Sequence, residues 1–579
     1  MKRLQTPAQA LACLLLVLLS WPLGSHGAQD DWRQTPTSFG SPHWWAAKGS
    51  LDWWRISDKS LLCTLPNSTP AWLLSGTPTS GSWMIEATFE PPFRYRDEGL
   101  LLNTAHDLST GLLVSMGPFG KLTLLRIKGG EVASVAMEFP LASALGPRAL
   151  RVTRVGASYD FWVDGIFVGN IANPLQERTA PPRWTDETEP DAGEYGVAFQ
   201  EQPTGVVRNL TVHPLSLERK YVHNPVLKPL DVAWEEKGIF TGSILKEGGT
   251  YFLYYSGTHE SPPAKDQPPE GITRAGVATS KDLRNWERGP NNPILLEGKP
   301  GDWDRALQVG CVVRSPDKRY ALLFDGFNGK RWGGVGVAYS NSPLGPFEKY
   351  SGNPVLTTGS PGQFDGEHVH LHTCLQLDDG RYALLYTGFG LARDPIKERA
   401  GDQGGLAFSS DLIHWEKYVG NPVLSFAPIG TFYDAHLRPK GILKRGEWYY
   451  LFFEGAHNDK LWFDQASLAR SKDLVHWEKF PFPLPSLGTG QDYDSIVTEW
   501  PVPTVSPDGN IVLLYMCLPL GGYSLMPNDP NKLSICMTQL PNSTLDHWDD
   551  YATPLTRDRT PPISRLSSGL RTDESYSRF

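Results

Sequence analysis

One internal repeat constrains the fold of this chain more than any other feature. The sequence Asn-Pro-[Val/Ile]-Leu begins at Asn224, Asn292, Asn353 and Asn421, at intervals of 68, 61 and 68 residues. A regular spacing of this length is typical of proteins that repeat one supersecondary unit. We therefore treat roughly 60–70 residues as the length of one module.

The sequence inside each module predicts short strands. Apolar runs such as 320–326 and 382–388 are bounded by Gly, Pro, Asp and Asn turns, and a Ser-x-Asp-Leu-x-x-Trp-Glu block follows at Ser280, Ser409 and Ser471. No segment shows a sustained helical period. Five copies of a unit with about four strands favour a closed ring, because a ring protects strand edges.

We predict an all-β chain with two parts. Residues 219–553 form a five-bladed β-propeller, with a stack of small sandwich domains as the alternative. Residues 35–215 lack the repeat and contain at least seven strands of period two, for example 82–90 and 206–212. This pattern predicts an N-terminal β-sandwich (jelly roll). The run 159–168 resembles a hairpin of concanavalin-like (laminin G-like) jelly rolls.

Both ends of the chain differ from these parts. Residues 1–28 have the charged, apolar and small-residue order of a secretory signal peptide, and an uncleaved membrane anchor is the alternative. We therefore expect a secreted or periplasmic protein with no membrane contact after signal removal. The polar tail 556–579 is predicted to be disordered. Of the six cysteines, Cys517 and Cys536 flank a loop between two strand-like runs and are the preferred disulfide pair.

The charge of the chain excludes one class of partner. There are 54 Lys and Arg residues against 63 Asp and Glu residues, which gives a net charge of -9. Nucleic-acid binding relies on clustered cationic side chains, and the sequence contains no basic run. We expect no nucleic-acid partner.

Each module places an aromatic residue directly before an acid. The five occurrences are Trp234-Glu235-Glu236, Trp303-Asp304, Phe364-Asp365, Tyr433-Asp434 and Tyr493-Asp494. In a propeller these positions precede the strand nearest the axis, so the acids would ring one mouth of the central funnel. Two interpretations stay open: the acids accept backbone hydrogen bonds as a structural device, or they do chemistry.

The third module departs most from the others. Glu367 is followed by His368, His370 and His372, which a strand places on one face. Three interpretations stay open here. The histidines ligate a metal ion, contact substrate or transfer a proton, or form a satisfied polar cluster.

The fourth and fifth modules carry polar residues where a structural first strand would carry Val or Ile. The fourth has Asp434, His436 and Arg438, and the fifth has Asp494, Glu499 and Trp500. Buried charges need partners or ligands, so these residues indicate a functional cavity.

The order of repeated motifs resembles that of the five-bladed propeller glycoside hydrolases, the superfamily of families 32, 43, 62, 68, 117 and 130. The resemblance covers about 330 residues. It implies action on glycans outside the cytoplasm, with acids from the first three blades in catalysis. Matched by position, these are Glu235 or Glu236, then Asp304, then Asp365 or Glu367. The chain has no Asn-Asp-Pro-Asn segment in blade one and no Arg-Asp-Pro in blade two, which disfavours a fructan-cleaving enzyme.

The predicted function is that of a secreted glycoside hydrolase acting on an oligo- or polysaccharide. A non-catalytic carbohydrate-binding protein of the same fold is the alternative. No cofactor is required, with a bound divalent cation such as calcium as an open possibility. The predicted catalytic residues are Glu236, Asp304, Asp365 and Glu367; the substrate-binding residues are Trp303, His368, His370, His436, Arg438, Asp434, Asp494, Glu499 and Trp500; the metal ligands are His368, His370 and His372.

Overall fold

The structure is a computed structural model that describes the chain between residues 32 and 548, apart from several gaps. The longest gaps are 91–98, 261–270, 391–400, 457–464 and 520–531. The predicted signal peptide and the predicted disordered tail lie outside the described residues. None of the helices in the described part has the length and hydrophobicity needed to cross a lipid bilayer.

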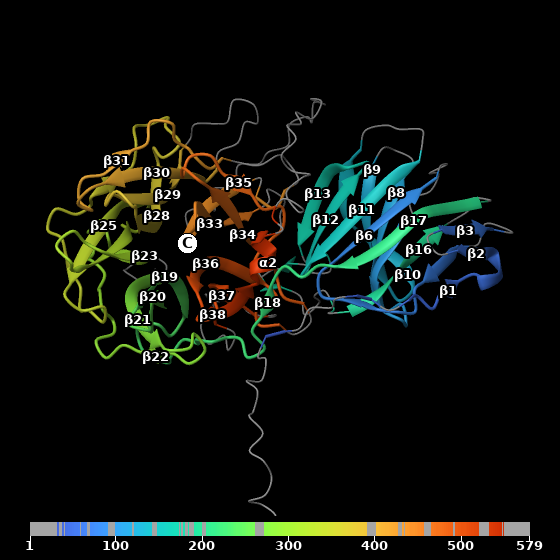
Figure 1. The fold of residues 1–579 in the computed structure, drawn as a ribbon, viewed down its shortest axis with the longest axis horizontal. Coiled ribbons are helices and arrows are strands. Elements are labelled where there is room, and N and C mark those ends of the chain that lie inside the picture. The colour runs from blue at the N-terminus through green and yellow to red at the C-terminus, as the bar shows by residue number, and fades with distance from the viewer. Residues whose placement is uncertain are drawn as a thin grey trace, which may run out of the picture.

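The N-terminal part consists mainly of two antiparallel β-sheets (Figure 1). The first sheet has the order β1-β4-β16-β7-β8-β9-β10, with β5 paired to β16. Its strands are β1 (Trp45–Lys48), β4 (Ala71–Leu74), β5 (Thr79–Ser80), β7 (Gly99–Thr104), β8 (Thr110–Gly117), β9 (Lys121–Lys128), β10 (Glu131–Pro140) and β16 (Ala192–Phe199).

The second sheet has the order β13-β12-β11-β6-β17-β3-β2. Its strands are β2 (Trp54–Ser57), β3 (Ser60–Thr64), β6 (Trp83–Phe89), β11 (Arg148–Val155), β12 (Ser158–Val163), β13 (Ile166–Ala172) and β17 (Thr204–Pro214). A 3-10 helix η1 (Leu51–Trp53) and a small hairpin of β14 (Arg178–Thr179) and β15 (Arg183–Trp184) complete this part. In β6 the burial alternates residue by residue, and the inward side chains of Ile85 and Val152 join one core with Leu73 and Val197 of the first sheet.

The C-terminal part consists of antiparallel units of about four strands arranged around an axis, and a parallel bridge joins the last two units into one eight-stranded sheet (Figure 1). The first unit contains β19 (Gly238–Glu247), β20 (Thr250–Glu260), β21 (Gly271–Ser280) and β22 (Glu287–Arg288), and the second contains β23 (Ala306–Arg314), β24 (Tyr320–Phe327), β25 (Trp332–Ser340) and β26 (Glu348–Lys349), with β27 (Leu356–Thr357) beside β25. The third contains β28 (His368–Gln376), β29 (Tyr382–Phe389), β30 (Gln403–Ser409) and β31 (Glu416–Lys417), and the fourth contains β32 (His436–Arg445), β33 (Trp448–Ala456), β34 (Gln465–Ser471) and β35 (Glu478–Lys479). The fifth contains β36 (Val497–Val505), β37 (Ile511–Leu518), β38 (Ser534–Leu540) and β18 (Arg219–Lys220).

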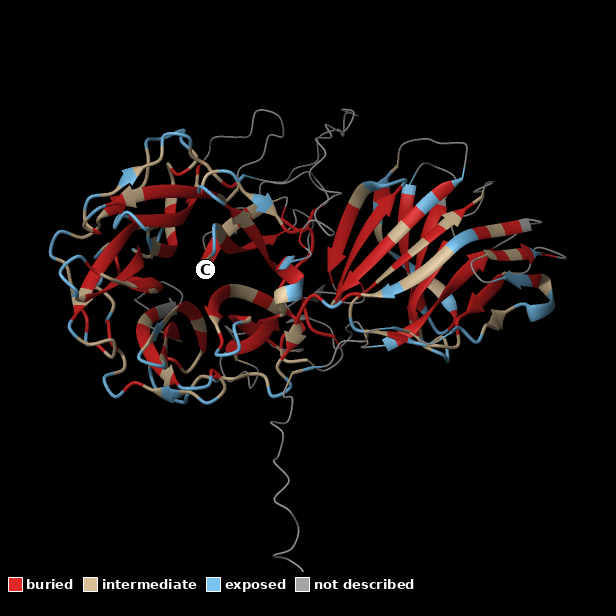
Figure 2. Ribbon diagram, viewed as in Figure 1, coloured by how far each residue is buried: buried red, intermediate tan, exposed pale blue. Residues whose placement is uncertain are grey.

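The first strands of these units form the inner wall of the ring. Strands β19, β23, β28, β32 and β36 each contact the next one, and β36 contacts β19. The strands are largely buried, whereas the connecting turns at the periphery are exposed (Figure 2). The predicted fold class, an all-β chain with a sandwich before a propeller, is confirmed. The domain boundaries and the concanavalin-like class of the sandwich stay predictions.

The repeated asparagine has a structural role that explains its recurrence. The side-chain amide of Asn292 accepts a hydrogen bond from Val277 N and donates one to Val277 O, both 2.9 Å long. The amide therefore pairs with the third strand of its unit as a neighbouring backbone would. The same pair of bonds recurs at Asn353 with Val337, at Asn421 with Leu406 and at Asn224 with Met537.

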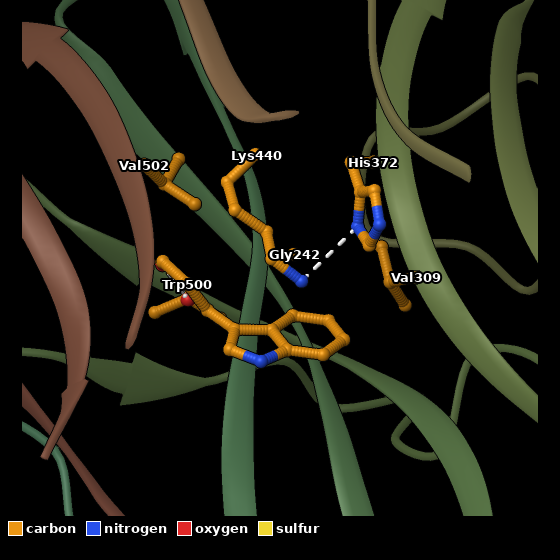
Figure 3. Close-up of a pocket in the computed structure, with 7 residues that line it drawn as sticks. Gly242, Val309, His372, Lys440, Trp500 and Val502 are labelled. Carbon is orange, nitrogen blue, oxygen red and sulfur yellow. Dashed lines mark hydrogen bonds between the residues drawn. The ribbon is translucent and has the colours of Figure 1, made fainter. Parts of the chain in front are cut away.

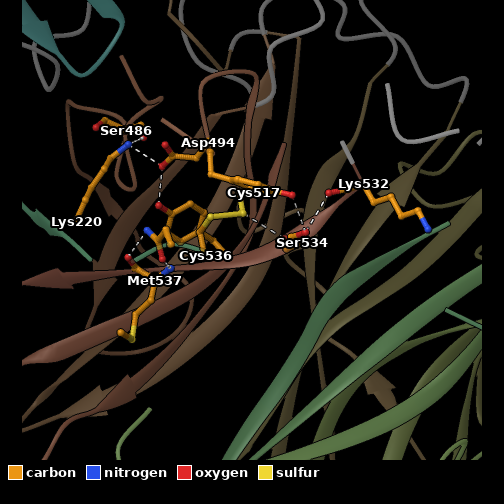
Figure 4. The surroundings of a disulfide bond; sticks show 11 residues. Lys220, Ser486, Asp494, Cys517, Lys532, Ser534, Cys536 and Met537 are labelled. Atoms are coloured by element: carbon orange, nitrogen blue, oxygen red, sulfur yellow. Dashed lines mark hydrogen bonds and ion pairs between the residues drawn. A yellow bond between two sulfur atoms is a disulfide. The ribbon is translucent and has the colours of Figure 1, made fainter. Parts of the chain in front are cut away.

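The ring is closed by the strand that enters it from the sandwich. Strand β18 pairs with β38, so the last unit combines the first and the last strands of the propeller. The disulfide between Cys517 and Cys536 joins β37 to β38 in this unit, which confirms the predicted pair (Figure 4). A short helix, α2 (Asn542–Asp546), follows β38.

The sandwich is attached to the propeller through buried contacts at the β11–β12 turn. Ala157 N donates to Leu487 O over 3.1 Å, and Trp162 and Phe482 belong to one apolar core. Gly156 has a φ of 59°, and a Cβ atom there would lie 2.1 Å from Leu487 O. Only glycine fits this close approach, because a side chain would collide with the backbone of the propeller.

Candidate functional site

The repeated aromatic–acid pairs form ion pairs within their own units. Each of the four acids in the described part of the chain forms an ion pair with a cationic side chain of the outermost strand, which connects the start of the inner strand to the edge of the blade. The pairs are Glu235 Oε1 with Arg288 Nη2 (2.9 Å), Asp304 Oδ2 with Lys349 Nζ (2.5 Å), Asp365 Oδ2 with Lys417 Nζ (2.6 Å) and Asp494 Oδ2 with Lys220 Nζ (2.7 Å). Figure 4 shows the last of these beside the disulfide.

A tyrosine of the second strand supports three of these acids. Tyr255, Tyr386 and Tyr515 donate hydrogen bonds of 2.9, 2.9 and 2.6 Å to the carboxylates of Glu235, Asp365 and Asp494. All four paired acids are buried. We name the four acid–cation pairs the blade ion pairs. Of the two interpretations of this repeat, the contacts support the structural one.

This placement bears on part of the predicted site. Asp304 and Asp365, predicted as catalytic, and Asp494, predicted to bind substrate, each form an ion pair with a lysine of their own blade. Trp303 stacks on Phe324 inside the apolar core, with ring centroids 5.7 Å apart, so its ring is a packing element. Asp434 lies outside the described residues.

Glu236 and Glu367, the other two predicted catalytic acids, lie just before β19 and β28. Both side chains are half-buried. Glu367 is anchored through its backbone, because its N–H donates to Phe389 O over 2.9 Å. The structure thus keeps Glu367 next to the histidine strand, without placing either acid in an ion pair of the kind that holds Asp304 and Asp365.

A small pocket lies on the axis of the ring, where all five inner strands meet. It is lined by Thr241, Gly242, Val309, His372, Lys440, Trp500 and Val502 (Figure 3). We name these residues, together with the charged side chains in contact with them, the funnel. The funnel differs from blade to blade, whereas the blade ion pairs repeat.

The floor of the funnel is built around Lys440. Its Nζ lies 3.0 Å from Glu454 Oε1 and 3.2 Å from His372 Nδ1. It also lies 3.7 Å from the centre of the Trp500 ring, a cation–π contact (Figure 3). Since an ammonium group only donates hydrogen bonds, His372 Nδ1 accepts, and the imidazole is neutral with its proton on Nε2.

The environment of the floor shifts two pKa values in the same direction. Burial lowers the pKa of His372 well below its ordinary value, and the charge of Lys440 lowers it further. Burial also lowers the pKa of Lys440, against the opposing effect of the Glu454 carboxylate. The neutral form of His372 is therefore favoured over a wide pH range.

Trp500 is held in the funnel by an unusual backbone. A β-bulge between Glu499 and Val502 interrupts the pairing of β36 with β37, and Trp500 has a φ of 55°. Non-glycine residues with positive φ carry strain that the surrounding structure must compensate. Here Thr241 Oγ1 donates to Trp500 O, and Trp500 N donates to Glu454 Oε2 over 3.3 Å. Hydrogen bonds thus hold both the backbone N–H and the backbone carbonyl of Trp500.

Above the floor, one guanidinium joins two carboxylates. Arg438 Nε lies 2.5 Å from Asp402 Oδ2, and its Nη1 lies 3.2 Å from Glu454 Oε1. The backbone of Asp402 accepts a 3.0 Å hydrogen bond from Leu437 N, which fixes the acid beside β32. Burial would raise the pKa of Asp402, but Arg438 and then His436 lower it, and the net shift is downward. Asp402 is therefore an ionised and partly accessible carboxylate.

The third blade adds His370 on the same side of the ring. His370 Nδ1 lies 2.6 Å from Asp325 Oδ2, and its ring contacts Trp332 with centroids 4.2 Å apart. The side chain of Asp325 is fully buried, whereas that of His370 is 19% exposed. The buried carboxylate therefore lies against one edge of the imidazole, and part of the ring remains accessible.

Two of the three histidines of the predicted cluster contact each other. His370 and His372 stack with ring centroids 5.4 Å apart. Burial lowers the pKa of His368, and the charge of His370 adds to this effect. Among the described residues, no group of three or more His, Cys, Asp or Glu side chains is arranged to hold a metal ion. With His372 Nδ1 facing Lys440, the contacts do not support the predicted metal site.

The remaining predicted residues lie close to this network. His436 begins β32, and its charge lowers the pKa of Asp402 after the larger effects of burial and Arg438. Glu499 precedes Trp500 on β36 and raises the pKa of Lys440, after the larger effects of burial, Glu454 and Arg438. The structure therefore brings His370, Arg438, His436, Glu499 and Trp500 together and leaves the acids of the blade ion pairs outside.

Four residues of the network were not predicted: Asp325, Asp402, Lys440 and Glu454. Two of them carry a signal in the repeat. The residue before the glycine of each second strand is Ser256, Asp325, Thr387, Glu454 and, without a following glycine, Met516. An acid at this buried position in only two blades marks both as exceptions. Asp402 directly precedes Gln403, the first residue of β30, and Asp464 precedes Gln465 in the same way in the sequence of the fourth unit, so this position does not single out Asp402.

Comparisons with known proteins give distant similarities. No family model matches the chain. Over 120 residues the chain is 27% identical to a β-1,2-mannobiose phosphorylase of Thermoanaerobacter sp. (strain X514), a match that covers 19% of this chain and 37% of that protein. The chain thus spans about a third of the length of this relative, and the match does not assign an activity.

Three solved structures illustrate the structural similarities. A family 117 glycoside hydrolase of the marine bacterium Zobellia galactanivorans is 18% identical (TM-score 0.37; 54% of this chain and 88% of that chain). A thermostable family-43 glycoside hydrolase is 20% identical (TM-score 0.38; 52% and 88%). The carbohydrate-binding module CBM66 from Bacillus subtilis is 15% identical (TM-score 0.24; 31% and 99%).

Proposed function

We propose that this protein is a carbohydrate-active enzyme that cleaves a glycosidic bond at the funnel of its propeller. Glycosidic cleavage needs a group that protonates the leaving oxygen and an ionised group that activates the attacking molecule or stabilises positive charge on the sugar. His370, with the carboxylate of Asp325 beside it, is the proposed proton donor. Asp402, kept ionised beside Arg438, is the proposed carboxylate.

One observation carries this proposal: charged side chains of blades three and four, which do not recur in all five blades, form a network at the funnel. Asp402, Arg438, Glu454, Lys440 and His372 form one continuous chain of contacts. Bringing several charges into a protein interior is costly, and structural needs are already met by the blade ion pairs. A cluster of this kind is typical of a site that acts on a ligand.

The assignment differs from the one predicted from the sequence. The predicted site relied on Glu236, Asp304, Asp365 and Glu367, of which Asp304 and Asp365 are engaged in blade ion pairs. Glu367 remains a secondary candidate, because it directly precedes His368. We propose an oligo- or polysaccharide as substrate, no obligatory cofactor, and export from the cytoplasm on the basis of residues 1–28.

A second function, glycan binding without cleavage, is favoured by one observation. The carboxylates of Asp325 and Glu454 are fully buried, and Asp402 is paired with a guanidinium. If these acids only organise the funnel, Trp500 and the histidines would serve as a binding surface.

The two functions are separated by a screen with purified full-length protein against neutral and acidic glycans. Each reaction is run in water alone and with added inorganic phosphate, so that hydrolysis and phosphorolysis are both detected. The enzyme proposal expects products that disappear in Asp402→Asn and His370→Gln. Binding of a glycan by calorimetry without products, in the wild-type protein, would establish the second function instead.

A further inference from the structure

Two cysteines outside the disulfide of blade five lie in contact with each other. Cys311 is on β23 and Cys374 is on β28, the inner strands of adjacent blades. Both side chains are free thiols, they are buried in the apolar core that joins these two blades, and Cys374 is the neighbour that interacts with the Cys311 thiol. Two thiols that meet between neighbouring strands have the proximity that a disulfide requires.

The backbones around this contact also approach closely. A Cβ atom at Gly310, directly before Cys311, would lie 2.3 Å from Leu371 Cδ2 of β28. Both strands carry a register shift at this level, between Val309 and Cys311 in β23 and between Leu371 and Thr373 in β28. The absence of a side chain at Gly310 allows the two inner strands to come together beside the cysteines.

We propose that Cys311 and Cys374 are a modification site that forms a second disulfide, which joins blade two to blade three behind the funnel. The protein already contains one disulfide, Cys517–Cys536, and such bonds persist in oxidising compartments. The second bond would fix β28, the strand that carries His370 and His372, against β23. This inference does not depend on the proposed glycan cleavage.

The chemistry of the step is thiol–disulfide exchange. One thiolate, after loss of its proton, attacks a sulfur of an oxidant that carries a disulfide, such as a dithiol–disulfide oxidoreductase or oxidised glutathione, and one thiol of the oxidant leaves. The second thiolate then displaces the remaining oxidant sulfur from this mixed disulfide. The two cysteines lose two electrons and two protons, and the oxidant disulfide is reduced to two thiols.

Burial determines when this exchange takes place. Burial raises the pKa of the Cys311 thiol well above its ordinary value, so the reactive thiolate is scarce in the folded protein. We therefore place the exchange during folding, before blades two and three close over the two sulfurs. Cys63, buried in the sandwich, provides an internal control, because it is free like Cys311 and Cys374 but lies in a different core.

The test counts free thiols in the protein without the predicted signal peptide, so that Cys13 is absent and five cysteines remain. The protein is refolded from its reduced state with oxidised and reduced glutathione, then alkylated in denaturant without reductant, and its peptides are identified by mass spectrometry. The proposal expects one alkylated cysteine, Cys63, and a cross-linked peptide that contains Cys311 and Cys374. Three alkylated cysteines, with the Cys517–Cys536 peptide cross-linked, would overturn it.

A second measurement keeps the proposal falsifiable if refolding is inefficient. Cys311→Ser, Cys374→Ser and the double variant are produced by export into an oxidising compartment, and their thermal midpoints are compared with the wild type. A disulfide predicts that each single variant loses the whole effect, roughly 5–10 °C, and that the double variant loses no more. Shifts that add up in the double variant would show that the thiols contribute only as separate packing groups.

Discussion

The blade ion pairs and the funnel use similar side chains in opposite ways. In the blade ion pairs, an acid at the start of the inner strand meets a cation of the outermost strand, and the arrangement recurs around the ring. At the funnel, acids stand at the corresponding positions of only some blades. Asp325 and Glu454 precede the glycine of the second strand in two blades, and Asp402 precedes the third strand, where the sequence of the fourth blade has Asp464. Repetition therefore identifies charges that hold the blades together, and departure from the repeat identifies charges assigned to a site.

The largest effect is expected from His370→Gln. The variant cannot deliver a proton, and removal of a general acid typically lowers turnover by ~10²–10⁴-fold. Turnover is measured on the glycan identified by the screen. The matched control is His414→Gln, because His414 Nδ1 also lies close to an aspartate, 2.7 Å from Asp411 Oδ2, but on an exposed turn. Equal losses in both variants would contradict the special position of the funnel.

Removal of the Cys517–Cys536 disulfide should lower the free energy of unfolding by about 2–4 kcal/mol. The bond closes a loop across 19 positions in the blade that completes the ring, and its loss enlarges the conformational freedom of the unfolded chain. Denaturant unfolding of the Cys517→Ser/Cys536→Ser double variant measures the change. An unchanged denaturant midpoint would show that the pairing of β18 with β38 closes the ring without a contribution from the disulfide.

The substitution Asp304→Asn should affect stability more than catalysis. It leaves Lys349 without its carboxylate in a largely buried site, which we expect to lower the free energy of unfolding by about 1–3 kcal/mol. Asp379→Asn serves as control, because Asp379 pairs with Arg381 on an exposed turn, where such pairs contribute little. If Asp304→Asn is as stable as the control, the blade ion pairs do not have the structural role assigned to them.

The smallest effect concerns pH. The pKa of His372 is lowered by folding, so at acidic pH the unfolded chain binds a proton that the folded chain does not. Its contribution is fully present above the ordinary value of about 6.5 and is lost as the pH falls below it, by at most about 1.4 kcal/mol per pH unit. Denaturant midpoints of wild type and His372→Gln between pH 5 and 7.5 measure this. If the midpoints of both proteins change with pH in the same way, His372 does not contribute to the pH dependence of stability.

The architecture could be predicted from the sequence because each recurring structural contact produces a sequence motif that recurs with it. The asparagine amide that pairs with the third strand produces the Asn-Pro motif. The Ser-x-Asp-Leu-x-x-Trp-Glu block builds the turn after it: in its second copy, Ser409 Oγ accepts from Leu412 N, and Trp415 Nε1 donates to Leu412 O. Such contacts are local or lie at fixed separations, so a single sequence reveals them.

The site was less accessible to prediction, for a physical reason. The funnel contacts join residues of different blades, such as His372 with Lys440, which lie 68 positions apart. A repeated sequence motif does not indicate which side chains of different blades contact each other near the axis of the propeller. The sequence leaves the roles of Asp304 and Asp365 open, because an acid beside an aromatic residue is compatible with catalysis and with an ion pair. Only the position of Lys349 and its equivalents distinguishes the two.

The most direct test compares two aspartate-to-asparagine variants on the same substrate. Turnover of Asp402→Asn and Asp304→Asn is measured with equal amounts of folded protein, determined from each variant's unfolding curve. The account predicts that Asp402→Asn loses at least ~100-fold in kcat, whereas Asp304→Asn stays within about tenfold of the wild type. The reverse result, a severe loss in Asp304→Asn with normal turnover in Asp402→Asn, would contradict the assignment of the active site to the funnel.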